Sequence, residues 1–217
     1  MCPCPLFRMF SYLLLALLMF GCKGRSGAEE TSVKDSREEW HMTDEPSPVQ
    51  PSPVQPSPVQ EESFRQAALD GDLDKVKLLL NQGVSCHVSD QEGHTALMFA
   101  AYNGHSEIIL ALIEAGAEVD QKDLMDRTAL LYGATGPFPE TVKILLEHGA
   151  DPNQIDSEEH FSPLMHAAAE GNLEVVKVLL NHGADKALKD VDGDDASFFA
   201  AQAGHGHVVE YLKGNNN

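Results

Sequence analysis

The sequence predicts a mainly α-helical solenoid of about five stacked helix-turn-helix units, terminal caps included, with β-hairpin fingers between the units. The first observation is a period of about 33 residues shared by two series of glycines. The first series is Gly71, Gly104, Gly171 and Gly204, and the second is Gly83, Gly116, Gly149 and Gly183. The second observation is an apolar stripe at helical spacing inside each period, such as Leu97, Ala100 and Ala101. A single unit cannot bury such stripes by itself, so the units must stack.

The elements of one unit follow from its residue types. Complete units run from 90 to 122, from 123 to 155 and from 156 to 189, and incomplete copies precede and follow them. We expect the first helix of each complete unit to be N-capped by a hydroxyl, from Thr95, Thr128 or Ser162. In the unit 90–122, Gly104 turns the chain into a second helix, which ends at Gly116, where a left-handed residue costs least.

These units resemble ankyrin repeats, whose motif is D-x-x-G-x-T-P-L-H-x-A-A-x-x-G-H-x-x-V-V-x-L-L-L-x-x-G-A-D. The resemblance covers residues 62–213 and recurs in all five units. Two departures predict local differences: Pro137 replaces the glycine of the inter-helix turn within GPFPE, and the unit beginning at Asp156 has one extra residue. The resemblance implies a protein that binds another protein through its stack and is not an enzyme.

Residues 1–21 have the pattern of a secretion signal. Arg8 precedes an apolar run of twelve residues, Met9 to Phe20, which is too short to span a bilayer. The ending Gly21-Cys22 resembles the lipobox of bacterial lipoproteins, although Phe20 is bulkier than that pattern prefers. We therefore expect Cys22 to be lipidated and to anchor the protein to a membrane of the bacterial cell envelope, facing the periplasm or the exterior. An ordinary cleaved signal and an uncleaved anchor are the alternatives.

Residues 22–61 are expected to form a disordered, Pro-rich tether. They contain three copies of PSPVQ, from Pro46 to Gln60, and proline at this density excludes helix and central strand. In polyproline II geometry these fifteen residues would extend about 45 Å. The ankyrin-repeat domain then occupies 62–213, and residues 214–217 form a polar tail.

The charge balance restricts the class of partner. The chain has 34 acidic and 15 basic residues and a formal net charge of −19, which excludes nucleic acid as a natural partner. Residues 62–213 alone hold 26 carboxylates against 10 lysines and arginines, a net of −16. Such a surface steers basic proteins towards it, so we expect a protein partner with a basic rim and a monomeric repeat protein.

The sequence indicates no enzyme site, cofactor or metal centre. It has no phosphate-binding loop, nucleophile elbow or H-E-x-x-H motif. The run DVDGDD at 190–195 begins like a calcium loop, but Asp195 and Ala201 stand where glycine and glutamate are required. His205 occupies a position where the ankyrin motif itself has histidine. Cys86 would be the one thiol left after signal removal and lipidation, so the fold must be stable without a disulfide.

We predict that large apolar side chains on the hairpin tips form the protein-binding site, at Leu124, Met125, Ile155 and Phe161, with Tyr102 facing the same groove. Hairpin residues ahead of an N-cap have no core of their own, so these side chains either pack between fingers or bind a partner. A second aromatic row occupies one equivalent position in four units and is assigned to core packing. It consists of Phe99, Tyr132, His166 and Phe199.

Three hypotheses of function follow. The first is a membrane-tethered, non-catalytic adaptor of the cell envelope. The second is an immunity or inhibitor protein whose acidic surface covers the basic site of a toxin or enzyme. The third is a metal or cofactor carrier that uses exposed histidines.

Overall fold

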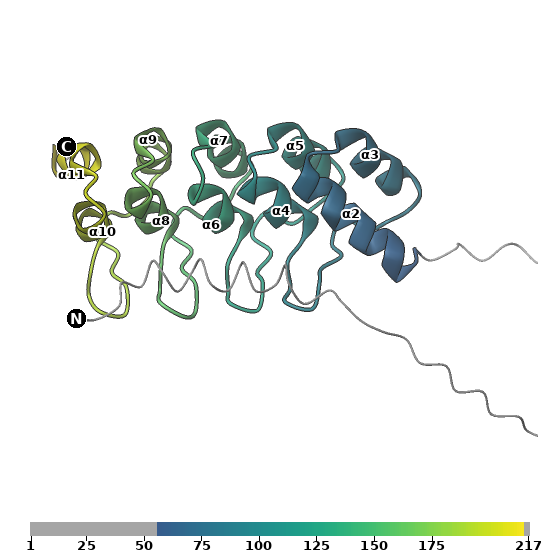
Figure 1. The fold of residues 1–217 in the computed structure, drawn as a ribbon, viewed down its shortest axis with the longest axis horizontal. Helices are drawn as coiled ribbons and strands as arrows, with labels where there is room; N and C mark the ends of the chain where they lie inside the picture. Colours follow the sequence, from purple (N-terminus) through teal and green to yellow (C-terminus); the bar gives the residue numbers. More distant parts are fainter. Residues whose placement is uncertain (1–55, 215–217) are drawn as a thin grey trace, which may run out of the picture. The chain divides into compact units, whose positions relative to one another are not determined.

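The computed structural model describes residues 56–214, which belong to one compact unit, 51–217. This part of the chain forms ten helices in five pairs. The pairs are α2 (Pro58–Asp70) with α3 (Leu73–Asn81), α4 (Ala96–Tyr102) with α5 (Ser106–Glu114), α6 (Ala129–Ala134) with α7 (Pro139–Glu147), α8 (Pro163–Ala169) with α9 (Leu173–Asn181), and α10 (Ala196–Gln202) with α11 (Gly206–Gly214). Figure 1 shows the even-numbered inner helices in one layer, the outer helices in a second, and the loops between pairs projecting from the inner layer. The predicted helical solenoid of five units is confirmed.

The fingers are hairpin-shaped loops, and the described residues form no extended strands in them. The structure has a single isolated bridge there, between Ser89 and Thr95. The loops are too short for a ladder of strand hydrogen bonds, and aspartate side chains close them instead, as described below.

The core lies between successive units. Leu97, Leu130 and Leu164, at one equivalent position of three inner helices, are at most 2% exposed. On the outer helices the equivalent residues Ile109 and Val142 are completely buried. Each inner helix packs on the next, as α4 does between α2 and α6. Full burial of one such side chain stabilises the fold by about 1.5–3 kcal/mol, and that burial exists only while the neighbouring unit is present.

Two of the three predicted hydroxyl caps form. The backbone N–H of Met98 donates to Thr95 Oγ1 at 3.3 Å, and that of Met165 donates to Ser162 Oγ at 3.3 Å. Thr128 occupies the same position before α6, but its buried hydroxyl makes no hydrogen bond. The prediction of a side-chain cap is therefore wrong for the third unit.

The inter-helix turn of the third unit differs from the others, as Pro137 predicts. Helix α6 has six residues where α4, α8 and α10 have seven. Phe138 then places its ring against Gly104 of the preceding unit, where an added Cβ would lie 2.4 Å from the ring. His105 and His205 occupy the equivalent place against Gly71 and Gly171. The turn of the third unit therefore differs from the others in sequence but makes the same contact with the preceding unit.

The expected domain boundaries at residues 61 and 213 both shift. Helix α2 begins at Pro58, so the last three residues of the third PSPVQ copy are helical and not part of a tether. Proline is tolerated at this first position because its missing N–H would have no helical partner. Ser57 and Gln60 form a capping box that fixes the helix start. Gly214, assigned to the tail, is the last residue of α11.

The expected signal, the lipidation site at Cys22 and the tether up to residue 55 lie outside the described residues, as do residues 215–217. Within the described part, no helix is both long enough and apolar enough to cross a membrane.

Removing the fourth and fifth units should destabilise those that remain. A chain truncated after Ile155 exposes the apolar residues of α6 and α7 that α8 and α9 now cover, among them Leu131 and Val142, which are at most 1% exposed. We expect less helix per residue and a lower melting temperature by circular dichroism. Native helix content with an unchanged melting temperature would show that the units do not depend on one another.

Candidate functional site

Each of the four fingers is built around one aspartate. We define the fingers as residues 90–95, 123–128, 156–162 and 190–195. The first aspartate of each finger accepts backbone N–H bonds across the loop, as Asp90 Oδ1 does from Glu92 at 3.0 Å and from His94 at 2.8 Å. Asp123, Asp156 and Asp190 accept equivalent bonds of 2.7–3.2 Å. These bonds fix the tip backbone without constraining the tip side chains.

Neighbouring fingers are joined through their backbones. The N–H of Leu124 donates to the carbonyl of Glu92 at 2.9 Å, and that of Ser157 donates to the carbonyl of Met125 at 3.0 Å. Val191 continues the series with a 3.2 Å bond to the carbonyl of Glu159. The four fingers therefore form one continuous row, and a partner would meet a preformed surface.

The left-handed position at each tip tolerates different residues. Gly93 and Gly193 occupy it with φ near 88°, and Asp126 and His160 occupy it with φ of 58° and 59°. In the first finger only glycine fits without movement, because a Cβ on Gly93 would lie 3.0 Å from the Cα of Asp123. Aspartate is among the non-glycine residues that adopt this conformation most readily.

The structure exposes two of the predicted binding residues. Leu124 is 78% exposed and Met125 is 41% exposed, and both lie at the tip of the second finger. Ile155 and Tyr102 are half-buried, at the base of the third finger and at the end of α4. Val191, which the sequence analysis did not select, is 51% exposed and occupies in the fourth finger the position of Leu124. Comparison of the tips position by position would have found it.

Phe161 is the exception, and the hypothesis that it is an exposed anchor is wrong. Its side chain is 5% exposed, and its ring centroid lies 5.3 Å from that of His166 and 4.7 Å from that of Phe199. Phe161 lies at the base of the loop, immediately before the N-cap Ser162, at the place that the half-buried His94 and Arg127 occupy in the first two fingers. Phe161 therefore contributes to the packing between the fourth and fifth units.

The row of residues assigned to core packing lies directly beneath the fingers. His166 and Phe199 are buried, and Phe99 and Tyr132 are half-buried. The ring of His94, from the first finger, lies 5.6 Å from Phe99 and 5.8 Å from Tyr132. These rings couple the base of each finger to the inner helices.

A buried polar network supports the second finger. The Asp123 side chain has no exposed surface, and its Oδ2 accepts a 2.7 Å bond from the Tyr132 hydroxyl and a 2.9 Å bond from Arg127 Nε. Burial alone would raise the pKa of the Asp123 carboxyl, but the bonds from Tyr132 and Arg127 outweigh it and hold the pKa below its usual value. Burial raises the pKa of Tyr132, and the adjacent Asp123 raises it further. The finger that presents Leu124 and Met125 is thus held by an ionised carboxylate.

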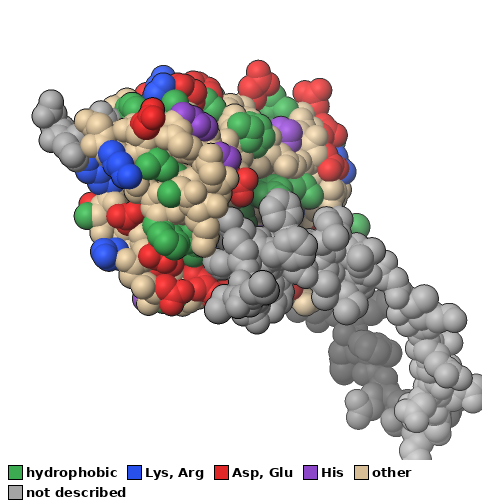
Figure 2. Space-filling model, turned by 60° about the vertical axis from the view of Figure 1, so that its left-hand side comes forward, with side chains coloured by type: hydrophobic (Ala, Val, Ile, Leu, Met, Phe, Trp, Pro, Cys, Tyr) green, Lys and Arg blue, Asp and Glu red, His purple; other side chains and the backbone are tan. Residues whose placement is uncertain are grey.

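The acidic charge of the domain is concentrated on the fingers. They contain eleven carboxylates against one arginine, Arg127. Partial desolvation and the carboxylates of Asp190, Asp192 and Asp195 raise the pKa of Asp194. Figure 2 shows several groups of acidic side chains on one face of the molecule, with apolar side chains in separate patches between them. The surface therefore combines exposed apolar tips with an acidic surround.

One group of side chains in the described residues has the composition of a metal site. The ligand atoms of Asp90, Glu92 and His94 lie within 4.8 Å of one another. However, Asp90 Oδ1 already accepts the loop N–H bonds, and Oδ2 lies 2.9 Å from His94 Nδ1. The folding of the first finger accounts for this cluster without an ion.

Taken together, the fold and the finger row define a helical repeat protein that offers an extended, solvent-facing surface to its ligand. A family model described as ankyrin repeats (3 copies) matches residues 64–156 and 139–217, which together span more than half of the chain. The chain belongs to the ankyrin-repeat family. Such proteins generally bind other proteins and are generally not catalytic. A comparison with curated proteins finds no match.

His166 should make the stability of the domain depend on pH. Burial lowers its pKa to about 4 from 6.5; Asp156 opposes this shift and Arg127 adds to it. Between those two pH values the unfolded chain binds more protons than the folded one, so stability falls as the pH falls through this window. The free energy of unfolding should fall by about 1.4 kcal/mol per pH unit, and by about 2 kcal/mol between pH 6.5 and 5.

The matched variant is His166→Phe, because Phe99 and Phe199 occupy the equivalent position in other units. Urea unfolding at pH 7 and pH 5 should show a loss about 2 kcal/mol larger in the wild-type protein than in the variant. Equal losses of unfolding free energy in the two proteins would mean that His166 has the same pKa in the folded and the unfolded state.

Proposed function

We propose that this protein is a membrane-tethered adaptor of the bacterial cell envelope that binds another protein through its finger row without catalysis. The observation that carries the proposal is the pair of exposed apolar residues, Leu124 and Met125, on a rigid row of otherwise acidic fingers. Apolar centres with polar or charged rims are typical of energetically important contacts between proteins.

The chemistry of the partner follows from the charge of the row. Eleven carboxylates and one arginine favour a partner with lysines and arginines around an apolar contact. The fingers are joined by backbone hydrogen bonds, so ordering them on binding costs little. A partner that reaches Leu124 in the second finger and Val191 in the fourth would extend across the acidic third finger.

The state of Cys86 suits an oxidising compartment such as the periplasm. Its side chain is 7% exposed, and its Sγ donates to the carbonyl of Ala115 at 3.3 Å. Burial raises the pKa of this thiol, which disfavours the reactive thiolate. Within the described residues no disulfide is needed to hold the stack together.

The same acidic row also favours a second candidate function. An immunity or inhibitor protein would use it to cover the basic active site of a toxin or enzyme. Affinity capture from the cells of origin with mass spectrometry separates the two functions. An adaptor should recover a resident envelope protein, and an inhibitor should recover a secreted toxin or its enzyme target.

Changing both exposed tip residues should weaken binding without affecting the fold. We expect Leu124→Ala with Met125→Ala to reduce the affinity for the captured protein by about 2 kcal/mol or more. The melting temperature should stay nearly constant, because exposed substitutions usually change stability by less than about 0.5 kcal/mol. The affinity of the captured protein can be measured by calorimetry.

Val59→Ala is the matched control, because Val59 is as exposed as Leu124, at 78%, but lies on α2 away from the finger tips. An unchanged affinity in the tip variant would place the binding surface elsewhere, and the proposal for the finger row would be abandoned.

The membrane tether has its own test. If Cys22 carries the lipid, Cys22→Ala should lose labelling by a fatty-acid analogue and leave the membrane fraction, because the acyl chains supply the membrane affinity. Fractionation and metabolic labelling measure both effects. Cys86→Ala, which alters a buried thiol, should change neither. Labelling that persists in Cys22→Ala would exclude this site of lipidation.

A further inference from the structure

Arg127 is the one lysine or arginine of the four fingers, and its side chain is fixed by its neighbours. Its Nε donates to Asp123 Oδ2 at 2.9 Å, and its Cζ lies 5.2 Å from the centre of the Tyr132 ring. The side chain is still 29% exposed, whereas that of Asp123 has no exposed surface. A partner therefore meets the cation of this pair and not its carboxylate. Because the cation is already ordered, binding through it costs little side-chain entropy.

The carboxylate of Asp123 has no acceptor position left for the rest of this guanidinium group. Its Oδ1 accepts the backbone N–H groups of Met125 and Arg127, at 2.8 and 2.9 Å. Its Oδ2 accepts Arg127 Nε and the Tyr132 hydroxyl, at 2.9 and 2.7 Å. Arginine has further N–H donors on its two Nη atoms. Those of Arg127 form no hydrogen bond within the described residues, so they are available to a ligand.

The second finger differs from the other three in offering a cation beside apolar side chains. Leu124 and Met125, on the same finger, are 78% and 41% exposed. The other acidic and basic side chains of the finger row are all carboxylates, eleven in number. Two like charges 4 Å apart repel each other by about 1 kcal/mol in water and by more near a protein surface. An acidic group of a partner is thus disfavoured along the row and has an arginine or lysine donor only at Arg127.

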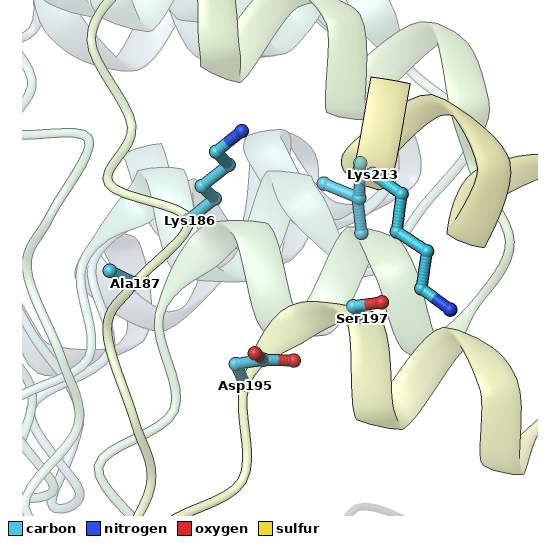
Figure 3. A pocket seen from close by; sticks show the side chains of 6 residues that line it. Lys186, Ala187, Asp195, Ser197 and Lys213 are labelled. Atoms are coloured by element: carbon cyan, nitrogen blue, oxygen red, sulfur yellow. The ribbon is translucent and has the colours of Figure 1, made fainter. Parts of the chain in front are cut away.

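A pocket in the last unit also presents cations. Its volume is about 410 Å³, and it is lined by Lys186, Ala187, Asp195, Ser197, Leu212 and Lys213. Figure 3 shows the Lys186 and Lys213 side chains on opposite sides of the opening, with Asp195 and Ser197 below it. No residue of the second finger lines this pocket. A carboxylate bound there would not determine what lies over Leu124, so the pocket provides a comparison for Arg127 and is not part of its site.

We propose that Arg127 determines the specificity of the finger row by binding, through its two Nη atoms, an aspartate or glutamate side chain of the partner. The inference rests on the proposed binding function of the row and adds one acidic residue to the basic partner expected there. Paired N–H···O bonds between arginine and a carboxylate are strong and directional, because both groups are charged and planar. With the acidic residue of the partner fixed at Arg127, a neighbouring apolar residue is placed over Leu124 and Met125.

The acidic surroundings make this single pair selective. A protein with its acidic residue at another place would set that residue against the carboxylates of a finger, and such a mismatch costs affinity. The exposed Asp126 and the buried Asp123 offset the long-range field of Arg127. The attraction therefore acts at hydrogen-bond distance, and we expect it to affect the dissociation rate more than the association rate.

Selection from a phage-displayed library of random peptides on the immobilised full chain tests the proposal. The selected peptides should be rich in lysine and arginine and should share one aspartate or glutamate at a fixed distance in sequence from an apolar residue. Replacing this acidic residue by its amide in a synthetic peptide should weaken binding to the wild-type protein about tenfold or more, as calorimetry measures it. The same replacement should not affect binding to Arg127→Gln, because this variant has no cation for the carboxylate.

Arg127→Lys separates the specificity of the finger from its stability. The variant keeps a positive charge beside Asp123 and lacks the two Nη atoms, so it should retain the melting temperature in circular dichroism and lose most of the preference for the acidic residue. Lys213→Gln is the matched control, since it removes an exposed cation outside the finger row. The preference for the acidic residue should remain in this control.

Two results overturn the proposal. One is a set of peptides that need Leu124 and Met125 for binding but share no acidic residue. The other is a preference for the acidic residue that persists in both Arg127→Gln and Arg127→Lys. A library that yields no peptide dependent on Leu124 and Met125 would instead contradict the proposed function of the finger row itself, so the two failures are distinguishable.

Discussion

Burial of small, closely packed inner helices against their neighbours is the interaction on which the rest of the structure depends. An inner helix of six or seven residues is too short to persist by itself, because helix nucleation is unfavourable and few hydrogen bonds follow it. Its stability comes from buried positions such as Leu130 and Ala134, whose cover is supplied by the units before and after. Any departure in one unit must therefore preserve its contacts with the next. Phe138 illustrates this, because it occupies against Gly104 the place that histidine occupies elsewhere.

The need to preserve contacts between units also applies to the fingers, which share one backbone geometry and differ in the chemistry of their tip side chains. An aspartate in each finger holds the loop, and backbone bonds such as that from Leu124 to Glu92 join one finger to the next. Because the tip side chains take no part in these bonds, Leu124, Ser157 and Val191 can occupy one equivalent position without altering the backbone. A surface of this kind gains specificity from its side chains alone, and it does so with little loss of conformational entropy on binding.

Sequence reasoning predicted the periodic features of the fold and missed details that depend on the contacts of individual side chains. The period of the glycines and the apolar stripes predicted five helix pairs, and Pro137 correctly marked the altered turn. The exposure of Leu124 and Met125 also followed from their place on a hairpin tip. Phe161 looked equivalent to them, but it immediately precedes an N-cap, at the base of the loop, where its ring packs against Phe199. Thr128 had the right residue type for a cap and has nearly the same extended backbone dihedrals as Thr95, yet its hydroxyl makes no hydrogen bond, which the residue type alone does not predict.

The ends of a repeat stack show why equivalent positions are more informative than individual residues. Phe198 by itself is an ordinary exposed aromatic residue, and its exposure needs no explanation. It becomes significant because Met98, Leu131 and Met165 are buried at the same position. A terminal unit that must face water tends to lose its apolar residues, because exposed apolar surface promotes association. The last unit has kept apolar residues on both of its helices, Phe198 on α10 and Val209 on α11.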